Sequence, residues 1–244
     1  MSLADAVRRI GPMPLPSAAQ ALKKRYSERL SRELAEEVAA GLRRVGFVGT
    51  KPLRGGPSEK EFQGGLGPKK VDVSFADDRR GLLLAVSVKS ICFPPYGKNL
   101  KNRFGDLCTE AITLHMRFPY SVVCALFAMP EAADQDRTRL RVISTFRRAS
   151  MLLGTISGRE EYTDAGEKFE DVTMVLFSPI AASGPGAVSN GAGARLFVAS
   201  PNPNSSIEIS EEEYFARLRD HYNLRNPHAQ VGIDQLKLED EDIP

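Results

Sequence analysis

The sequence is poor in the residues that build several common kinds of functional site. Its 244 residues include no tryptophan, three histidines and three cysteines. The cysteines, Cys92, Cys108 and Cys124, are widely separated, which fits neither a CxxC zinc site nor a disulfide framework. A histidine-rich metal centre is not expected from so few histidines. Zinc-site and disulfide-rich classes are therefore set aside.

Long apolar runs are also missing, since none approaches the roughly 18–20 residues that a membrane span needs. The N-terminal segment lacks the apolar core and cleavage site of a secretory signal. Free cysteines and the missing signal fit the reducing cytoplasm. We therefore expect a cytoplasmic protein without a membrane anchor.

Charge is unevenly distributed along the chain. Residues 1–150 carry 26 Lys and Arg against 15 Asp and Glu, whereas residues 151–244 carry 7 against 16. A basic front portion suggests a polyanionic partner, because neutralising phosphates releases condensed counterions. The alternative is that these basic residues only solvate helix faces.

The first part of the chain predicts an arm and a long helix. Three prolines indicate that residues 1–16 form an irregular arm. Ser17 could cap a helix that continues to about Val45, with an apolar residue every fourth position from Leu22 to Leu42. Glu37 falls on the apolar side of this helix and Glu36 points away. Glu37 could be a snorkelling or salt-bridged side chain, or a functional acid.

The next segment predicts a basic loop and two strands. Residues 49–70 are rich in Gly and Lys but lack the order of a phosphate-cradling loop, so a flexible loop is expected. Residues 71–75 alternate between apolar and polar side chains, and residues 81–91 form an apolar run typical of a central strand. The turn from Asp77 to Gly81 favours an antiparallel hairpin.

Further along, the pattern alternates between helices and strands. Helices are expected over about 101–118, 136–153 and 210–224, and strands over 120–129, 172–178 and 195–199. His115 lies on the apolar face of the first of these helices and is expected to be a core residue. This order predicts an α/β protein with helices packed on a mixed sheet. The predicted core spans residues 17–180, followed by a Gly/Ser/Ala loop over 181–194, a C-terminal α+β extension over 195–232 packed on the core, and an acidic disordered tail over 233–244.

Asp72 and Lys89 are the residues with the clearest chemical signal. Each is charged within an apolar strand segment, where an unpaired charge would be costly. Ser87 shares the face of Lys89, since side chains repeat every second residue in a strand. Carboxylates that hold Mg²⁺ beside an ammonium suit phosphodiester hydrolysis. The alternative is that Asp72 and Lys89 form a structural ion pair.

Asp72 followed by Ser87-Val88-Lys89 resembles the motif of the PD-(D/E)XK nuclease superfamily of type II restriction endonucleases and repair nucleases. The resemblance covers roughly residues 59–130 and implies an α-β-β-β-α-β core. Ser87 stands where the family pattern has an acid. Similarity to members that keep a serine there implies a second acid on the following helix.

By this resemblance Asp72 and Glu110 would bind Mg²⁺, with Asp106 as the alternative to Glu110. Lys89 would act on the attacking water, Ser87 would assist by hydrogen bonding, and Glu37 resembles the accessory acid. Basic and amide side chains near the motif could bind DNA phosphates or base edges. These are Lys69, Lys70, Lys98, Asn99, Lys101, Asn102 and Arg103.

The sequence therefore predicts a Mg²⁺-dependent endonuclease for double-stranded DNA, related to restriction or defence. By analogy it would be a homodimer with a cognate DNA methyltransferase in the same system. Two alternatives stay open. One is a non-catalytic DNA-binding protein on the same fold, and the other is an α/β protein unrelated to nucleic acids.

Overall fold

The computed structural model describes residues 2–56, 60–139, 142–181, 192–202 and 207–232. Two N-terminal helices are followed by a run of four strands. Helices and strands then alternate up to residue 178, and two further strands and a helix complete the described chain. Their order is α1 (Leu3–Ile10), α2 (Gln20–Arg44), β1 (Lys60–Gly64), β2 (Gly67–Val71), β3 (Val73–Asp77), β4 (Gly81–Ser90), α3 (Tyr96–Arg117), β5 (Val122–Pro130), the 3₁₀ turn η1 (Glu131–Ala133), α4 (Thr145–Gly154), β6 (Asp171–Ser178), β7 (Gly193–Val198), β8 (Ile207–Ile209) and α5 (Glu211–Arg225).

A six-stranded mixed sheet forms the centre of the molecule, with strand order β3-β4-β5-β6-β7-β8. β4, β5 and β6 are parallel neighbours, whereas β3, β7 and β8 pair antiparallel. β1 and β2 form a separate hairpin. The predicted α/β class with helices on a mixed sheet is therefore confirmed. The antiparallel pairing of β3 and β4 also agrees with the predicted hairpin.

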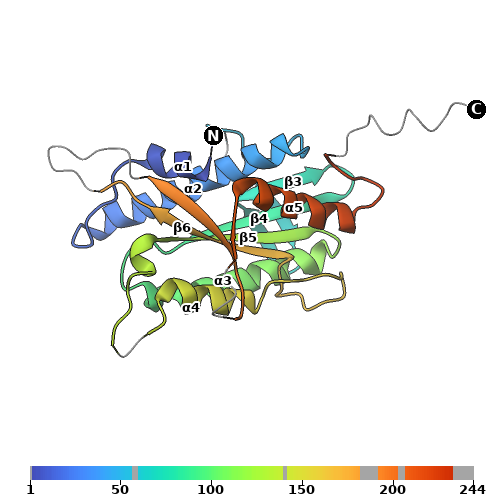
Figure 1. Ribbon diagram of the computed structural model, residues 1–244. Helices are drawn as coiled ribbons and strands as arrows, with labels where there is room; N and C mark the ends of the chain where they lie inside the picture. The colour runs from blue at the N-terminus through green and yellow to red at the C-terminus, as the bar shows by residue number, and fades with distance from the viewer. Residues whose placement is uncertain (1, 57–59, 140–141, 182–191, 203–206, 233–244) are drawn as a thin grey trace, which may run out of the picture.

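Helices cover both faces of the sheet, with α1, α2 and α5 on one side and α3 and α4 on the other (Figure 1). A hydrophobic core lies on each face of the sheet, and the side chains of β4 contribute to both. Val86 and Val88 pack toward α2, while Ala85 packs toward α3. Ser87 and Lys89 share the parity of Ala85, so their side chains leave the sheet on the α3 side.

The N-terminal arm predicted for residues 1–16 is wrong over residues 3–10, which form α1. Ser2 and Asp5 make a reciprocal capping box at its start, and Leu3, Val7 and Ile10 are buried against the core. The three prolines that suggested irregular structure all follow the end of this helix at Gly11. A short helix is stable here because its apolar face is buried.

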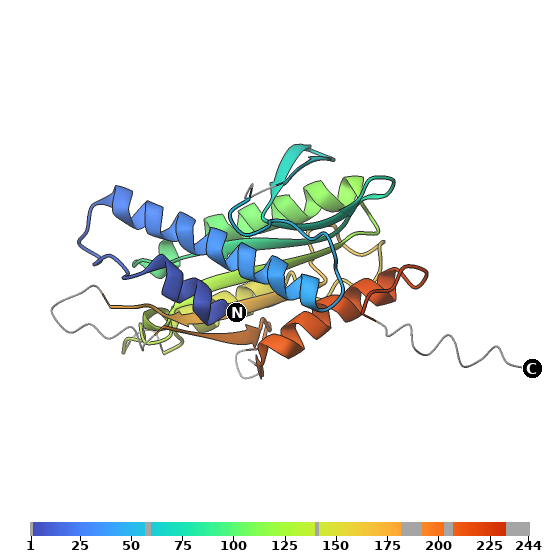
Figure 2. The ribbon, with the colours of Figure 1, turned by 90° about the horizontal axis from the view of Figure 1, so that it is seen from above.

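The flexible loop predicted for residues 49–70 is wrong over residues 60–70, where β1 and most of β2 lie. The turn of this hairpin docks on α3, as the Gly65 N–H donates a hydrogen bond of 2.8 Å to the Thr113 carbonyl. A Cβ on Gly64 would lie only 2.4 Å from Thr113 Cγ2, so glycine permits this close approach. Figure 2 shows the hairpin beside α3 at the edge of the molecule.

The other helix limits shift by a few residues, and α4 is shorter than predicted. The helix expected over 136–153 begins only at Thr145, because Ser144 caps it by accepting a hydrogen bond from the Arg147 N–H. β7 and β8 continue the central sheet and α5 covers it, so residues 193–198 and 207–225 are part of the same layered unit. Most of the loop at 181–194 and the whole tail at 233–244 lie outside the described residues.

Candidate active site at the end of the central strand

Asp72 lies in the one-residue gap between β2 and β3, beside the far end of β4. β3 begins at Val73, which pairs with Val86, so the last residues of β4 extend beyond it. The backbone N–H of Val88 is thereby left for a side chain, and it donates to Asp72 Oδ2 at 2.7 Å. This bond holds the carboxylate against the end of β4, where Lys89 follows.

Lys89 connects the two predicted acids. Its Nζ lies 3.4 Å from Asp72 Oδ2 and 3.0 Å from Glu110 Oε2. Glu110 projects from α3, on the side where Leu107, Ala111 and Leu114 are buried. The structure therefore brings the three side chains together from a strand junction, a central strand and a helix.

Glu110 is the most enclosed of the three, with 1% of its side chain exposed. Its Oε2 also lies 3.0 Å from Nζ of Lys69 on β2. Its Oε1 is buried and has no hydrogen-bond partner among the described residues. One carboxylate oxygen thus faces two ammonium groups while the other remains available as an acceptor.

The pKa shifts follow from burial and from these charges. Burial raises the pKa of Asp72, although the nearby Lys89 ammonium opposes this shift. Burial alone would raise the pKa of Glu110, but Lys89 and Lys69 outweigh it and hold this pKa below its ordinary value. Burial alone would lower the pKa of Lys89, but Glu110 and Asp72 hold it above its ordinary value. Lys89 is therefore a stable cation at neutral pH.

Ser87 and Asp106 are placed very differently. Ser87 is buried beneath Lys89 in β4, and its Oγ has no hydrogen-bond partner among the described residues. Asp106 is about half exposed and pairs with Arg103 at 3.2 Å on the outer side of α3. Of the two candidate helix acids, Glu110 is the one that contacts Lys89.

Asp72 and Lys89 line a cleft of about 840 Å³ between the first half of α2 and the start of α3. Basic side chains outnumber acidic ones along it. The basic side chains are Lys23, Lys24, Arg32, Lys89, Lys98 and Arg103, and the acidic ones are Glu28 and Asp72. Such an excess of positive charge favours a polyanion over a neutral ligand. The α2 contribution was missed from the sequence, where Lys23, Lys24 and Arg32 read only as the polar side of an amphipathic helix.

The residues predicted to bind DNA divide into three groups. Lys98, Asn99 and Arg103 line the cleft. Lys70, Lys101 and Asn102 are exposed but are not part of its lining. Lys69 contacts Glu110, which was not foreseen because its hairpin had been taken for a loop.

Glu37 is not joined to this group by any described contact. Its carboxylate pairs with Arg9 of α1 and with Arg54, and only 2% of its side chain is exposed. Glu37 is also not among the residues that line the cleft. The salt-bridged interpretation of Glu37 therefore fits its contacts, and the acid that α2 presents to the cleft is Glu28.

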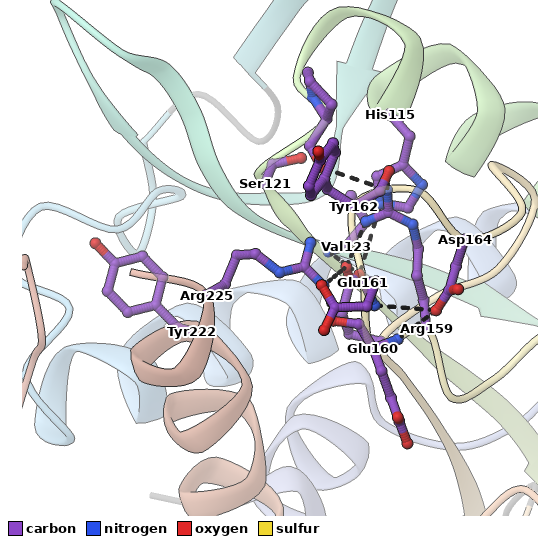
Figure 3. A network of polar contacts seen from close by, with 12 residues as sticks. His115, Ser121, Val123, Arg159, Glu160, Glu161, Tyr162, Asp164, Tyr222 and Arg225 are labelled. Carbon is purple, nitrogen blue, oxygen red and sulfur yellow. Dashed lines mark hydrogen bonds and ion pairs between the residues drawn. The ribbon is translucent and has the colours of Figure 1, made fainter. Parts of the chain in front are cut away.

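A second buried cluster of charges closes the other end of the sheet (Figure 3). Glu170 pairs with Arg159 at 2.8 Å and with Arg225 of α5 at 3.3 Å, and it accepts a hydrogen bond from the Val123 N–H. His115 lies 3.6 Å from Glu170, and its Nδ1 is 3.0 Å from the Gly166 carbonyl. These contacts tie α3, α5 and the segment before β6 to the sheet, which agrees with a core role for His115.

The residues at the cleft suit a hard divalent cation with few protein ligands. No group of three or more His, Cys, Asp or Glu side chains able to hold a metal occurs in the described part of the chain. Mg²⁺ commonly uses only one or two carboxylates and completes its shell with water and substrate oxygens. Asp72 lines the cleft and could be one such carboxylate, and the unpartnered Oε1 of Glu110 could be the second, although Glu110 is enclosed and does not itself line the cleft.

Comparison of the chain with protein-family models, curated proteins and solved structures found no match. Within the described residues, no helix is both long enough and apolar enough to cross a bilayer. The case for a function therefore depends on the cleft and its charged residues.

Proposed function

We propose that the chain is a Mg²⁺-dependent endonuclease that hydrolyses phosphodiester bonds in DNA. The observation that carries the proposal is the convergence of Asp72, Lys89 and Glu110 beside a basic cleft. In the central sheet, α2 is followed by β3, β4, α3 and β5, with β3 and β4 antiparallel and β4 and β5 parallel; β1 and β2 form a separate hairpin, so the sheet has two strands between α2 and α3 where the expected core has three. The arrangement agrees only in part with a core of the restriction-endonuclease type.

In this proposal each side chain has a distinct task. Asp72 and Glu110 would hold the cation, which neutralises charge on the phosphoryl oxygens and activates a water molecule. Lys89 remains protonated because its pKa is raised, so it donates hydrogen bonds to the attacking water or a phosphate oxygen and does not act as a base. Ser87 would assist by hydrogen bonding at the site, since its buried Oγ has no partner among the described residues. The cleft lysines and arginines would hold the DNA backbone.

Cleavage of both strands of a duplex would require two copies of the site, so a homodimer is proposed with this function. A role in restriction or defence would require a DNA methyltransferase that protects the host sequence. Sedimentation of the protein with and without duplex DNA tests the first of these points.

The experiment is cleavage of plasmid and linear duplex DNA by purified protein with Mg²⁺ or with a chelator. We expect cleavage only with Mg²⁺, and we expect Lys89→Ala to abolish it while circular dichroism shows a folded protein that still binds DNA. Lys89→Arg is the companion variant, because it keeps the positive charge beside Glu110 without the compact ammonium. Unchanged cleavage by folded Lys89→Ala protein would refute the proposal.

A second candidate is a DNA-binding protein without catalysis. Two carboxylates and two ammonium groups balance at this site without a metal ion, since Lys69 and Lys89 both contact Glu110. This candidate would be supported if the protein binds duplex DNA but does not cleave it at any Mg²⁺ concentration. Glu110→Gln should then leave DNA binding unchanged.

A further inference from the structure

Lys69 stands out because it adds a second ammonium to a carboxylate that Lys89 already neutralises. Both Nζ atoms lie 3.0 Å from the same oxygen, Glu110 Oε2. We propose that Lys69 is a built-in counter-ion, which occupies Glu110 when no metal is bound and leaves it when a divalent cation binds. This inference rests on the proposed function and concerns how the same site is kept inactive without metal.

The position of Lys69 is fixed by the fold and is not the chance position of a surface chain. In the β1–β2 hairpin Lys69 pairs with Phe62, whose side chain is buried against Phe118. The Gly65 N–H bonds to α3, the same helix that carries Glu110. Strand alternation then directs Lys69 inward, while its neighbour Lys70 is exposed.

The charges explain why Glu110 needs this partner in the metal-free protein. An enclosed carboxylate is costly unless it is paired, and Lys89 is shared with Asp72. Lys69 brings the site to two negative and two positive charges. A bound divalent cation would turn this balance into a surplus of positive charge, so one ammonium group would be repelled.

Of the two lysines, Lys69 is the one that can leave. Its side chain is 31% exposed and lies on an edge hairpin, whereas that of Lys89 is 17% exposed and comes from the central strand β4. Rotation of Lys69 toward solvent would remove one of the two ammonium groups from Oε2 without moving the backbone, while Lys89 keeps its contact. Glu110 would then present Oε2 together with the unpartnered Oε1.

Lys69 therefore acts as a positioning residue that sets how much divalent cation the site requires. With Lys69 in place, a cation must displace an ammonium, and its apparent affinity is lowered. Without metal, the same contact holds the Glu110 carboxylate ionised and oriented. The site would be neutral and inactive until the cation concentration is high enough.

The test measures Mn²⁺ binding to the DNA-free protein by titration calorimetry, with Mn²⁺ as a probe for Mg²⁺. Lys69→Met is expected to bind Mn²⁺ about tenfold more tightly than the unchanged protein, because a competing charge is removed. Lys69→Arg, which keeps the charge, should bind no more tightly than the unchanged protein. Lys60→Met is the matched control, since it removes an exposed charge from the same hairpin and should change the affinity less than about twofold.

Thermal melting gives a second readout that does not depend on catalysis. Metal-free Lys69→Met should melt at a lower temperature than the unchanged protein, and saturating Mn²⁺ should raise its melting temperature by a larger increment. Equal or weaker Mn²⁺ binding by Lys69→Met would overturn the inference and leave the nuclease proposal standing. If no form binds Mn²⁺, both the inference and the metal-dependent function fail.

Discussion

At the scale of single residues, Glu110 provides the carboxylate that Ser87 does not. Ser87 and Lys89 leave β4 on the side of α3, and Glu110 is on the buried face of that helix. The side chain of Glu110 on α3 therefore reaches the space beside Lys89. An acid at position 87 on β4 would reach the same space. The position of the acid in the sequence matters less than the position of its oxygens.

The equivalence of positions 87 and 110 can be tested by removing the acid from α3 and placing one on β4. Glu110→Gln should lower Mg²⁺-dependent cleavage by about 100-fold or more, because one of two carboxylates is lost. The double variant Ser87→Asp/Glu110→Gln should recover about tenfold of that loss, because a carboxylate returns beside Lys89. Ser87→Asn/Glu110→Gln is the uncharged control. Cleavage rates on a supercoiled plasmid give the measurement, and a double variant no faster than Glu110→Gln alone would contradict the relocation.

In the proposed metal site, the raised pKa of Asp72 predicts that cation binding weakens as pH falls. Burial raises its pKa above the ordinary 3.8, whereas the pKa of Glu110 lies below its ordinary 4.5. As pH falls, the raised pKa of Asp72 favours its protonation, and a protonated carboxyl is a poor metal ligand. Mn²⁺ affinity measured from about pH 8 down to about pH 4 should therefore decline toward the acid end of the range. Constant affinity across this range would show that Asp72 does not bind the cation.

At the scale of secondary structure, the elements with strong periodic patterns could be predicted and those that depend on tertiary contacts could not. The apolar run at 81–91 and the stripe from Leu22 to Leu42 identify β4 and α2 from their side chains alone. α1 is only eight residues long and is stable because it packs on α2 and the sheet. The β1–β2 hairpin likewise depends on two glycines that fit against α3. Lys69 could not be assigned to the site because its strand was not predicted.

Glu37 is expected to stabilise the fold without binding metal. Glu37→Gln should lower the free energy of unfolding by about 1–3 kcal/mol, because it weakens the pairs with Arg9 and Arg54 that tie α1 and the following loop to α2. The cost stays moderate because both arginines are partly exposed and can be solvated. Urea denaturation gives the stability, and Mn²⁺ titration gives the second readout. Glu33→Gln, which weakens the more exposed pair with Arg9, is the control. Reduced Mn²⁺ affinity with unchanged stability would assign Glu37 to the site.

At the scale of the whole molecule, the two ends of the parallel strands use similar charged groups for different purposes. At the end near Val123, Glu170 is enclosed by Arg159 and Arg225, and breaking these contacts would leave buried charges unpaired. At the end near Lys89, Asp72 and Lys89 line the cleft, and Glu110 is enclosed beside Lys89. One end ties helices to the sheet, and the other places charged side chains along the cleft.

The basic cleft predicts a specific dependence of DNA binding on salt. Lys23 and Lys24 line the cleft, so Lys23→Ala/Lys24→Ala should weaken binding of a labelled duplex and reduce the slope of log affinity against log salt concentration by about 1 to 2. Arg79→Ala/Arg80→Ala removes the same charge from the β3–β4 turn, at the opposite end of β4 from Lys89. It should leave the slope nearly unchanged, because phosphates held in the cleft do not reach that turn. Fluorescence anisotropy over a series of KCl concentrations measures both variants. If both double variants lose the same amount of DNA affinity, binding depends on the overall charge of the protein and not on the cleft.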